Sequence, residues 1–133
     1  MKSLNEISYA VIGAAIRVHS ALGPGLLEST YEKCLMIELN QAGLTVERQR
    51  SLPLRYKGTL IENAYRIDIL VEGQLIIELK AIERLTPLDT AQLLTYLKLS
   101  GLNLGLLLNF NATKMTAGIK RVINSATDFR MTG

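Results

Sequence analysis

The sequence predicts one α/β domain in which helices flank a mixed β-sheet. Three observations predict it: helical periodicity near both ends of the chain, three consecutive strand-like runs between them, and a continuous apolar run after the last helix. The length of 133 residues suits a single domain, and a hydrophobic content of 48% is enough for one sizeable core. We therefore expect one domain over residues 1–133.

Two amphipathic helices open the chain. Apolar residues from Ile7 to Val18 recur at spacings of three and four, which predicts a helix over about residues 4–21 that ends at "LGPG". A second helical pattern runs from Leu26 to about Ala42, where Gly43 marks its end. Its predicted buried face consists of Leu27, Tyr31, Cys34, Leu35 and Leu39.

Three strand-like runs follow, near residues 46–56, 60–71 and 74–82. The turn signals "KG" and "EGQ" separate them at the spacing of hairpins, so the three runs predict an antiparallel meander. Later in the chain, "NLGLLLNF" at residues 103–110 predicts a strand covered on both faces, and residues 118–124 favour one more short strand.

The helix between the meander and the later strand has the clearest boundaries. Thr86 is expected to be its N-cap, Pro87 its first helical residue and Asp89 a member of its first turn, while Gly101 ends it. This helix would therefore act as the crossover that joins the meander to the strand at residues 103–110.

Composition excludes several classes of protein. The net charge of +3 permits a polyanionic partner but does not describe a strongly basic tail. Cys34 is the only cysteine, so an internal disulfide and a multi-cysteine zinc site are excluded, and a reducing, cytoplasmic location is expected. Because Glu6 and Arg17 interrupt the first apolar segment, we expect neither a signal peptide nor a membrane span there.

Three charges interrupt the apolar stretch "RIDILVEGQLIIELKAI": Asp68, Glu78 and Lys80. Strand residues of equal parity share a face, so Glu78 and Lys80 point the same way. A three-residue loop centred on Gly73 would place Asp68 directly across from Glu78, with Cβ atoms about 4.5–5.5 Å apart. Two carboxylates at that distance repel, and in a partly buried cleft the pKa of at least one of them should rise.

A divalent metal ion would explain this arrangement. Hard cations such as Mg²⁺ or Mn²⁺ take carboxylate oxygens and restore the ionised form of both acids. Lys80 could then orient a water or a phosphate oxygen beside the ion. A hairpin with one solvated face would also carry such charges without any function, and that interpretation stays open from these three residues alone.

Two helical patterns add polar groups that could face the same strands. Glu28 lies one turn ahead of Tyr31, on what the periodicity predicts to be the apolar face of the second helix. Gln92 and Tyr96 stand at i and i+4 on the helix that follows Lys80, so they share one stripe. Both helices are thus expected to direct polar side chains toward the strand face.

These residues resemble a known family. Gly25, Glu28 and Tyr31 spell the G-x-x-E-x-x-Y signature of the small prokaryotic GxxExxY protein family, and "YRIDILVEGQLIIELKAI" is similar to the rest of it, over roughly Ile7 to Ile123. That family is grouped with the PD-(D/E)XK nuclease superfamily, which implies a restriction-endonuclease-like mixed sheet flanked by helices. One departure is Ile67, which stands where the superfamily name has a proline.

The resemblance also implies roles for individual residues. Lys80 would assist the nucleophilic water, while Gln92 and Tyr96 of an exonuclease-type helix would contact phosphate or support Lys80. His19 matches loosely a histidine found in part of that branch, and a helix-end histidine with no ligand role is the alternative. The implied ligands of Mg²⁺ or Mn²⁺ are Glu28, Asp68, Glu78 and the Leu79 carbonyl.

The expected function is metal-dependent hydrolysis of phosphodiester bonds in DNA or RNA. A binding module for nucleic acid or protein that keeps the nuclease fold without the chemistry is the first alternative. A structural partner in a larger assembly is the second, because the apolar residues from Val11 to Val18 could cover a second copy or a partner protein. Cations along the meander would contact phosphates or only be solvated: Arg48, Arg50, Arg55, Lys57 and Arg66.

Overall fold

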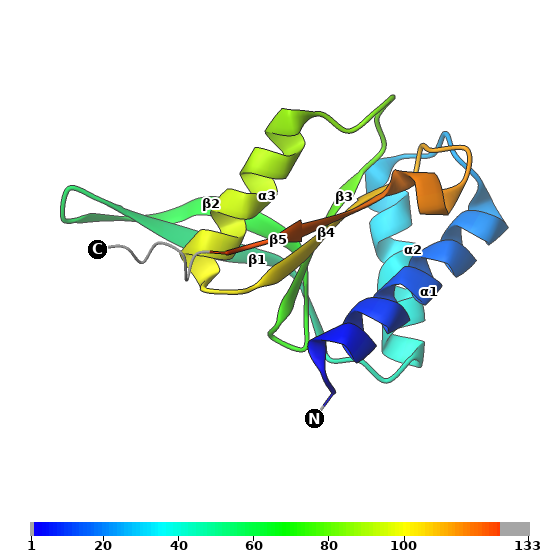
Figure 1. Cartoon of the computed structure of the whole chain (residues 1–133), viewed down its shortest axis with the longest axis horizontal. Helices are drawn as coiled ribbons and strands as arrows, with labels where there is room; N and C mark the ends of the chain where they lie inside the picture. The colour runs from blue at the N-terminus through cyan, green and yellow to red at the C-terminus, as the bar shows by residue number, and fades with distance from the viewer. Residues whose placement is uncertain (1, 126–133) are drawn as a thin grey trace.

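A computed structural model describes residues 2–125 (Figure 1). In that part of the chain three α-helices and a short 3-10 helix accompany five strands. In chain order the elements are α1 (Leu4–Leu22), α2 (Glu28–Gln41), β1 (Val46–Tyr56), β2 (Thr59–Val71), β3 (Leu75–Lys80), α3 (Pro87–Ser100), β4 (Leu104–Asn109), the 3-10 helix η1 (Met115–Gly118) and β5 (Ile119–Ile123).

The five strands form one mixed sheet in the order β1-β2-β3-β4-β5. Strands β1, β2 and β3 are the antiparallel meander that the turn signals predict. Strand β4 then pairs parallel to β3 after the α3 crossover, and β5 returns antiparallel to β4. The predicted α/β fold with a mixed sheet is confirmed, and the strand expected over residues 118–124 is present as β5.

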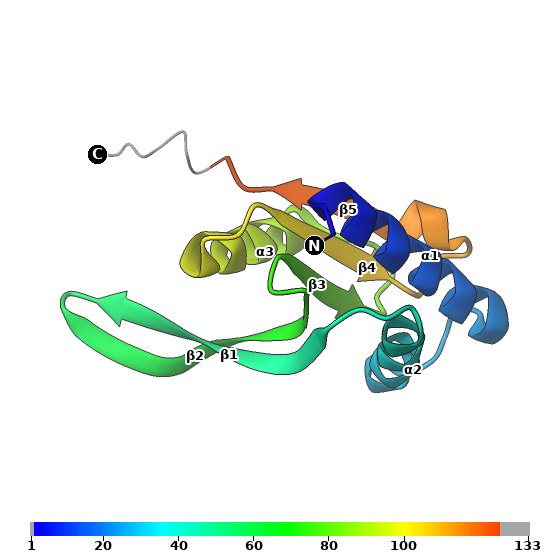
Figure 2. The ribbon, with the colours of Figure 1, turned by 90° about the horizontal axis from the view of Figure 1, so that it is seen from below.

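Helices cover both faces of the sheet (Figures 1 and 2). Alternation along β3 decides which side chain meets which helix. Ile77 and Leu79 pack into the core on the α1 and α2 side, whereas Ile76 packs with Leu93 and Leu97 of α3. Both faces of β3 are therefore buried, which is why its first three residues, Leu75 to Ile77, are all apolar.

Helix α3 begins and ends as predicted. Thr86 and Asp89 form a reciprocal capping box, and Gly101 adopts the left-handed conformation with φ 72°. Helix α2 differs, because it begins at Glu28 and not at Leu26. Gly25 has φ 94° and Leu27 is extended and 73% exposed, so the prediction that Leu27 lies on the buried face is wrong.

The turn between β2 and β3 agrees with the predicted hairpin. Val71 pairs with Leu75, which leaves a three-residue loop centred on Gly73. Strand β3 ends at Lys80, two residues earlier than predicted, because the Asn109 side chain bonds both the N–H and the carbonyl of Ile82 in place of a further ladder. On the other side of β2, the β1–β2 hairpin extends beyond the rest of the sheet (Figure 2).

Candidate active site

Asp68 and Glu78 bond to each other's strands at the point where β2 and β3 part. The last ladder pair is Ile69 with Ile77, so Asp68 and Glu78 are next in the same register. The Asp68 N–H donates to Glu78 Oε2 at 2.9 Å, and the Leu79 N–H donates to Asp68 Oδ2 at 2.8 Å. The two carboxylates therefore replace main-chain acceptors and hold the diverging strands at a defined separation.

Both carboxyl groups have raised pKa values. Burial is the main cause at Glu78, which is 5% exposed, and the Asp68 carboxylate adds to it, so that the pKa of Glu78 rises to about 8. Burial also raises the pKa of Asp68 to about 6, although the bond from the Leu79 N–H opposes the shift. The pKa values of both acids thus move in the direction expected for a buried pair, and the repulsion between the two carboxylates appears in the shift of Glu78.

Lys80 is the last residue of β3, and its charge acts on both acids. Its Nζ lies 3.7 Å from Asp89 Oδ1, and it lowers the pKa values of Asp68 and Glu78 by less than burial raises them. Asp89 also accepts hydrogen bonds from Thr86 as part of the α3 cap. Asp89 therefore has a second role that its capping pattern alone does not reveal, namely to hold the Lys80 side chain.

Glu28 lies at the rim of a cavity of about 150 Å³ beside Asp68. It is the first residue of α2 and is exposed, but it shares one stripe of α2 with the buried Tyr31 and Glu32. Because it lines this cavity together with Asp68, Glu28 does point toward the strand face, as expected. An acid in a first turn is stabilised by the helix dipole, which accounts for its place. Burial raises the pKa of Glu28, with Lys80 opposing the shift. The cavity is lined by Glu28, Ser29, Glu32, Gln49, Asp68 and Leu79.

Tyr31 and Gly25 shape the loop that precedes Glu28. The Tyr31 hydroxyl donates to the Gly23 carbonyl at 2.6 Å and accepts from the Leu26 N–H at 3.1 Å. The Tyr31 ring stacks on Phe110 with centroids 4.7 Å apart. The Gly25 N–H donates to Asn111 Oδ1 at 3.1 Å, so Gly25 and Tyr31 both hold the loop from which α2 begins at Glu28.

Tyr96 and Gln92 line a separate cavity of about 330 Å³ along α3. Tyr96 is buried, its ring lies 5.5 Å from that of Tyr65, and its pKa is raised first by burial and then by Glu78 and Asp68. The charges of Glu78 and Asp68 therefore act on the Tyr96 hydroxyl, but Tyr96 and Asp68 line different cavities. Gln92 is exposed on the wall of the same cavity, at a position open to a ligand.

His19 lies in the last turn of α1 and donates from Nε2 to the Ala112 carbonyl at 2.7 Å. This bond fastens the end of α1 to the segment before η1. The structure therefore favours the helix-end role for His19 over the ligand role.

Sequence reasoning missed three residues of the Asp68 cavity, namely Ser29, Glu32 and Gln49. Glu32 is buried, and its carboxylate accepts from Arg48 Nη2 at 3.1 Å and from Gln49 Nε2 at 2.6 Å. The one available signal was the i, i+4 spacing of Glu28 and Glu32, which puts both acids on one stripe of α2.

Comparison with models of known protein families identifies the family of this chain. A family model described as the PD-(D/E)XK nuclease superfamily matches residues 5–122, which include every element from α1 to β5 in whole or in large part. The chain belongs to the PD-(D/E)XK nuclease superfamily. No curated protein matches the chain at a significant level. The restriction-endonuclease-like fold implied by the resemblance is thereby confirmed.

As a member of the PD-(D/E)XK superfamily, the domain is related to nucleases that generally use divalent metal ions. The donor set fits such an ion, because carboxylate oxygens of Asp68 and Glu78 and the Leu79 carbonyl are hard ligands. Burial raises the pKa values of both acids, and the charge of a divalent cation between them would favour their ionised forms. Within residues 2–125 no three acidic, histidine or cysteine side chains converge closely enough to hold an ion, so Glu28 would have to turn inward from the rim.

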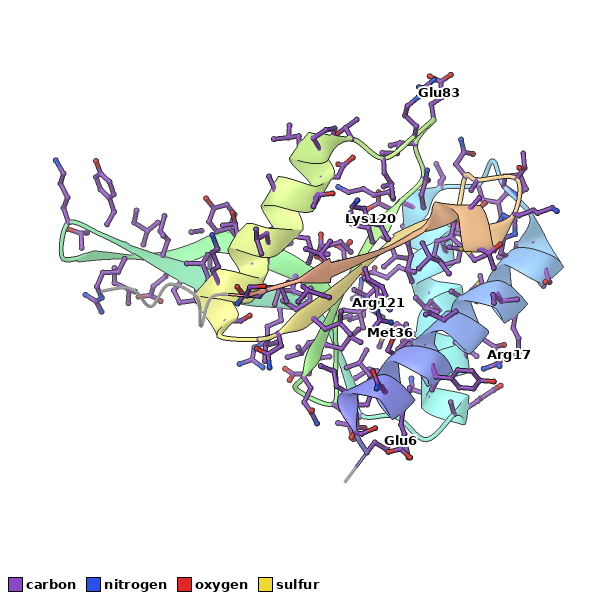
Figure 3. The ribbon with its side chains drawn as sticks, in the orientation of Figure 1. Glu6, Arg17, Met36, Glu83, Lys120 and Arg121 are labelled. Atoms are coloured by element: carbon purple, nitrogen blue, oxygen red, sulfur yellow. The ribbon has the colours of Figure 1, made fainter. Side chains whose placement is uncertain are left out.

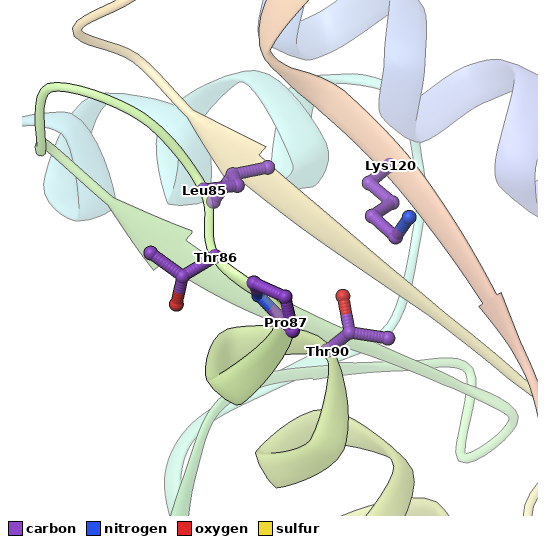
Figure 4. A pocket seen from close by; sticks show the side chains of 5 residues that line it. All are labelled: Leu85, Thr86, Pro87, Thr90 and Lys120. Atoms are coloured by element: carbon purple, nitrogen blue, oxygen red, sulfur yellow. The ribbon is translucent and has the colours of Figure 1, made fainter.

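A further cavity of about 360 Å³ flanks the first turn of α3 in this PD-(D/E)XK domain (Figure 4). Glu78 pairs with Leu107, and Leu107 pairs with Lys120, so Lys120 stands in the Glu78 row two strands across the sheet, about 9.5 Å away. Lys120 and Thr90 both line the cavity, which brings a cation and a hydroxyl group to the same end of the sheet as Lys80.

Among the helices of residues 2–125, none has the length and apolar character needed to cross a membrane.

Tyr31→Phe should destabilise the domain through the loop ahead of Glu28. The substitution removes the hydroxyl that serves both Gly23 and Leu26 but keeps the stacked ring, so we expect a loss of roughly 1–3 kcal/mol in the free energy of unfolding. Urea denaturation measures this loss. Tyr9→Phe is the control, because Tyr9 is 82% exposed and the same deletion there should change stability by less than about 0.5 kcal/mol. Equal effects of the two substitutions would contradict the role of Tyr31.

Proposed function

We propose that this domain hydrolyses phosphodiester bonds of DNA or RNA with Mg²⁺ or Mn²⁺ as cofactor, and that it belongs to the GxxExxY family within the superfamily. The observation that carries the proposal is the reciprocal bonding of Asp68 and Glu78, with Lys80 beside them on the same strand. A pair with only a structural role is a poor explanation, because burial destabilises the ionised forms of both acids and so costs folding free energy.

Asp68, Glu78 and the Leu79 carbonyl would hold the ion, and Glu28 would complete the set from the rim of the cavity. When bound, a divalent ion neutralises charge on the phosphate and makes a bound water more acidic. The bonds from the Asp68 and Leu79 N–H groups keep one oxygen of each carboxylate oriented, so the second oxygen of each remains for a ligand. These bonds orient Asp68 and Glu78 before the substrate arrives, whereas Glu28 would turn inward to join them.

Lys80 would position the attacking water and offset negative charge on the phosphate. Its ion pair with Asp89 ties its ammonium group to the first turn of α3, which restricts where the group can go. Tyr96, which is buried, and Gln92, which is exposed on the wall of the same cavity, would contact the neighbouring phosphate. For Lys80, Gln92 and Tyr96 all to contact the substrate in these roles, the substrate must pass over the start of α3.

Exposed cations near this path would bind the nucleic acid backbone without reading its sequence. Arg66 lies on β2 two residues before Asp68. Lys120 lines the cavity of about 360 Å³ at the first turn of α3. Arg48 and Arg50 contribute less free charge, because they form ion pairs with Glu32 and Glu47. We expect binding to weaken as the salt concentration rises.

A cleavage assay tests the proposed function. Single-stranded and double-stranded DNA and RNA are incubated with the protein in Mg²⁺, in Mn²⁺ and in a chelator. We expect at least one substrate to be cut only when metal is present, and Asp68→Asn to reduce cutting to the level without enzyme. Glu83→Gln is the matched control, because Glu83 lies at an exposed loop tip (Figure 3) and should leave cutting unchanged. Metal-independent binding without any cleavage would support the non-catalytic alternative.

A further inference from the structure

Glu32 is a buried acid that the proposed chemistry does not use. Its side chain is 8% exposed, and its two oxygens accept from Arg48 Nη2 and Gln49 Nε2. Burying a carboxylate costs free energy that one ion pair and one hydrogen bond rarely exceed, so such a group is weak evidence for stability as its purpose. Stability alone therefore does not explain why Glu32 is buried with these contacts.

Gln49 is the second unusual residue, because it has φ 56° in the middle of a strand. A left-handed conformation costs energy for any residue with a Cβ. Lys57 and Glu72 also have positive φ, but each directly precedes the glycine of a tight hairpin turn that requires it. Asn63 lies where the β1–β2 register shifts. Turn geometry and register shift explain those three residues, whereas neither explains Gln49.

Gln49 stands opposite Asp68. The ladder is intact on both sides, with Arg48 paired to Ile69 and Arg50 paired to Ile67, so Gln49 and Asp68 are the facing residues between these pairs. The strained residue of β1 is therefore the immediate neighbour of a predicted metal ligand on β2.

Strand β2 also changes face at Asp68. In a regular strand Ile67 and Ile69 would point to the same side of the sheet. Here Ile67 packs in the core on the α3 side, while Ile69 packs in the core on the α1 and α2 side. Local irregularities of this kind re-aim side chains next to active sites. At this point the Asp68 side chain comes to line the cavity that Glu32 and Gln49 share.

The geometry points to Glu32 and Gln49 as a positioning pair for Asp68. The Glu32 carboxylate holds the Gln49 amide, the amide holds the left-handed backbone of β1, and that backbone sets the turn of β2 that aims Asp68 into the cavity. Neither residue touches the reacting atoms. The inference rests on the proposed function only in so far as Asp68 binds a metal ion, and the placement of Asp68 can be tested without one.

Gln49→Gly separates positioning from stability. Glycine adopts φ 56° without steric cost, so the strain is relieved, but the amide that reaches Glu32 is lost. In the metal-free protein, hydrogen exchange should become at least about tenfold faster at two amides: Leu79, whose N–H bonds the Asp68 carboxylate, and Asp68, whose N–H bonds Glu78 and so reports the place of the Asp68 backbone. Mn²⁺ affinity measured by calorimetry should fall about 10–100-fold.

Gln49→Gly also relieves backbone strain and removes one partner of Glu32, and a control variant tests each of these two effects separately. Lys57→Gly relieves a similar φ of 49° at the tip of the hairpin, and should change neither exchange at Asp68 and Leu79 nor Mn²⁺ affinity. Arg48→Ala removes the other partner of Glu32 and should lower the melting temperature while leaving Mn²⁺ affinity within about threefold.

Unchanged exchange at Asp68 and Leu79 in Gln49→Gly would overturn the inference. It would also be overturned if Mn²⁺ affinity fell equally in Arg48→Ala and Gln49→Gly, because general loss of stability would then explain both. A wild type that binds no Mn²⁺ would contradict the proposed function instead, and the exchange measurement would still decide whether Glu32 and Gln49 position Asp68.

Discussion

Glu78→Gln should make the metal-free protein more stable at neutral pH and remove its stabilisation by Mn²⁺. The pKa of Glu78 is raised from 4.5 to about 8, first by burial and then by Asp68. A tenfold change in an acid's ionisation constant corresponds to about 1.4 kcal/mol, so the cost at neutral pH is on the order of several kcal/mol. Glutamine is neutral at every pH and still offers an oxygen to the Asp68 N–H, so it avoids this cost.

The direction of the pH dependence follows from the direction in which the pKa moves. Because the folded pKa lies above the unfolded one, the unfolded protein binds fewer protons than the folded protein between about pH 4.5 and 8. The stability contributed by protonated Glu78 is therefore fully present below pH 4.5 and is lost as the pH rises through about 8. Asp68, with a pKa raised to about 6, adds a loss in the lower part of that range.

Thermal melts of the wild type and Glu78→Gln, each with and without Mn²⁺ between pH 5 and 8, measure both effects. Without metal at pH 7 the variant should melt roughly 5–10 °C above the wild type, and the difference should shrink toward pH 5. Mn²⁺ at about 100 times its dissociation constant should stabilise only the wild type, by about 2.7 kcal/mol. Glu83→Gln, at its exposed loop tip, should behave as the wild type does. Equal melting temperatures in all samples would exclude the metal site.

Lys80→Met should slow cleavage strongly while leaving the metal site in place. Lys80 supplies the cation beside the acids but is not a metal ligand, so its removal should lower the cleavage rate by about 10²–10⁴-fold, the usual contribution of a positioned acid–base group. Mn²⁺ affinity should change by less than about tenfold, because Asp68, Glu78 and the Leu79 carbonyl remain. Single-turnover cleavage and calorimetry on the same samples measure the two quantities.

Lys33→Met is the matched control for this experiment, since Lys33 is exposed on α2 and should leave the cleavage rate unchanged. Asp89→Asn gives an intermediate test: it removes the charge that pairs with Lys80 but keeps an oxygen for the Thr86 cap. We expect a smaller loss of rate than for Lys80→Met. If Lys80→Met cut substrate as fast as the wild type, Lys80 would have no part in the reaction.

Much of the fold could be predicted because local interactions encode it. The capping box of Thr86 and Asp89 and the turn around Gly73 each depend on residues within a few positions of one another, so spacing alone reveals them. The register of that turn then places Asp68 across from Glu78 by counting along two strands. The predicted start of the second helix failed because Tyr31 bonds back to Gly23 and keeps the preceding residues extended.

The sequence by itself determined the order of elements, the meander, the crossover and the meeting of Asp68, Glu78 and Lys80 on neighbouring strands. Only the tertiary structure decided that Asp89 holds Lys80, that Glu28 lies at the rim, and that Glu32 reaches Gln49 across 17 positions. The physical reason is that these contacts depend on how α2 and α3 pack on the sheet and on how deeply each charge is buried. Periodicity assigns a residue to a face of its own element, whereas the partner on another element and the cost of ionisation emerge only when the layers assemble.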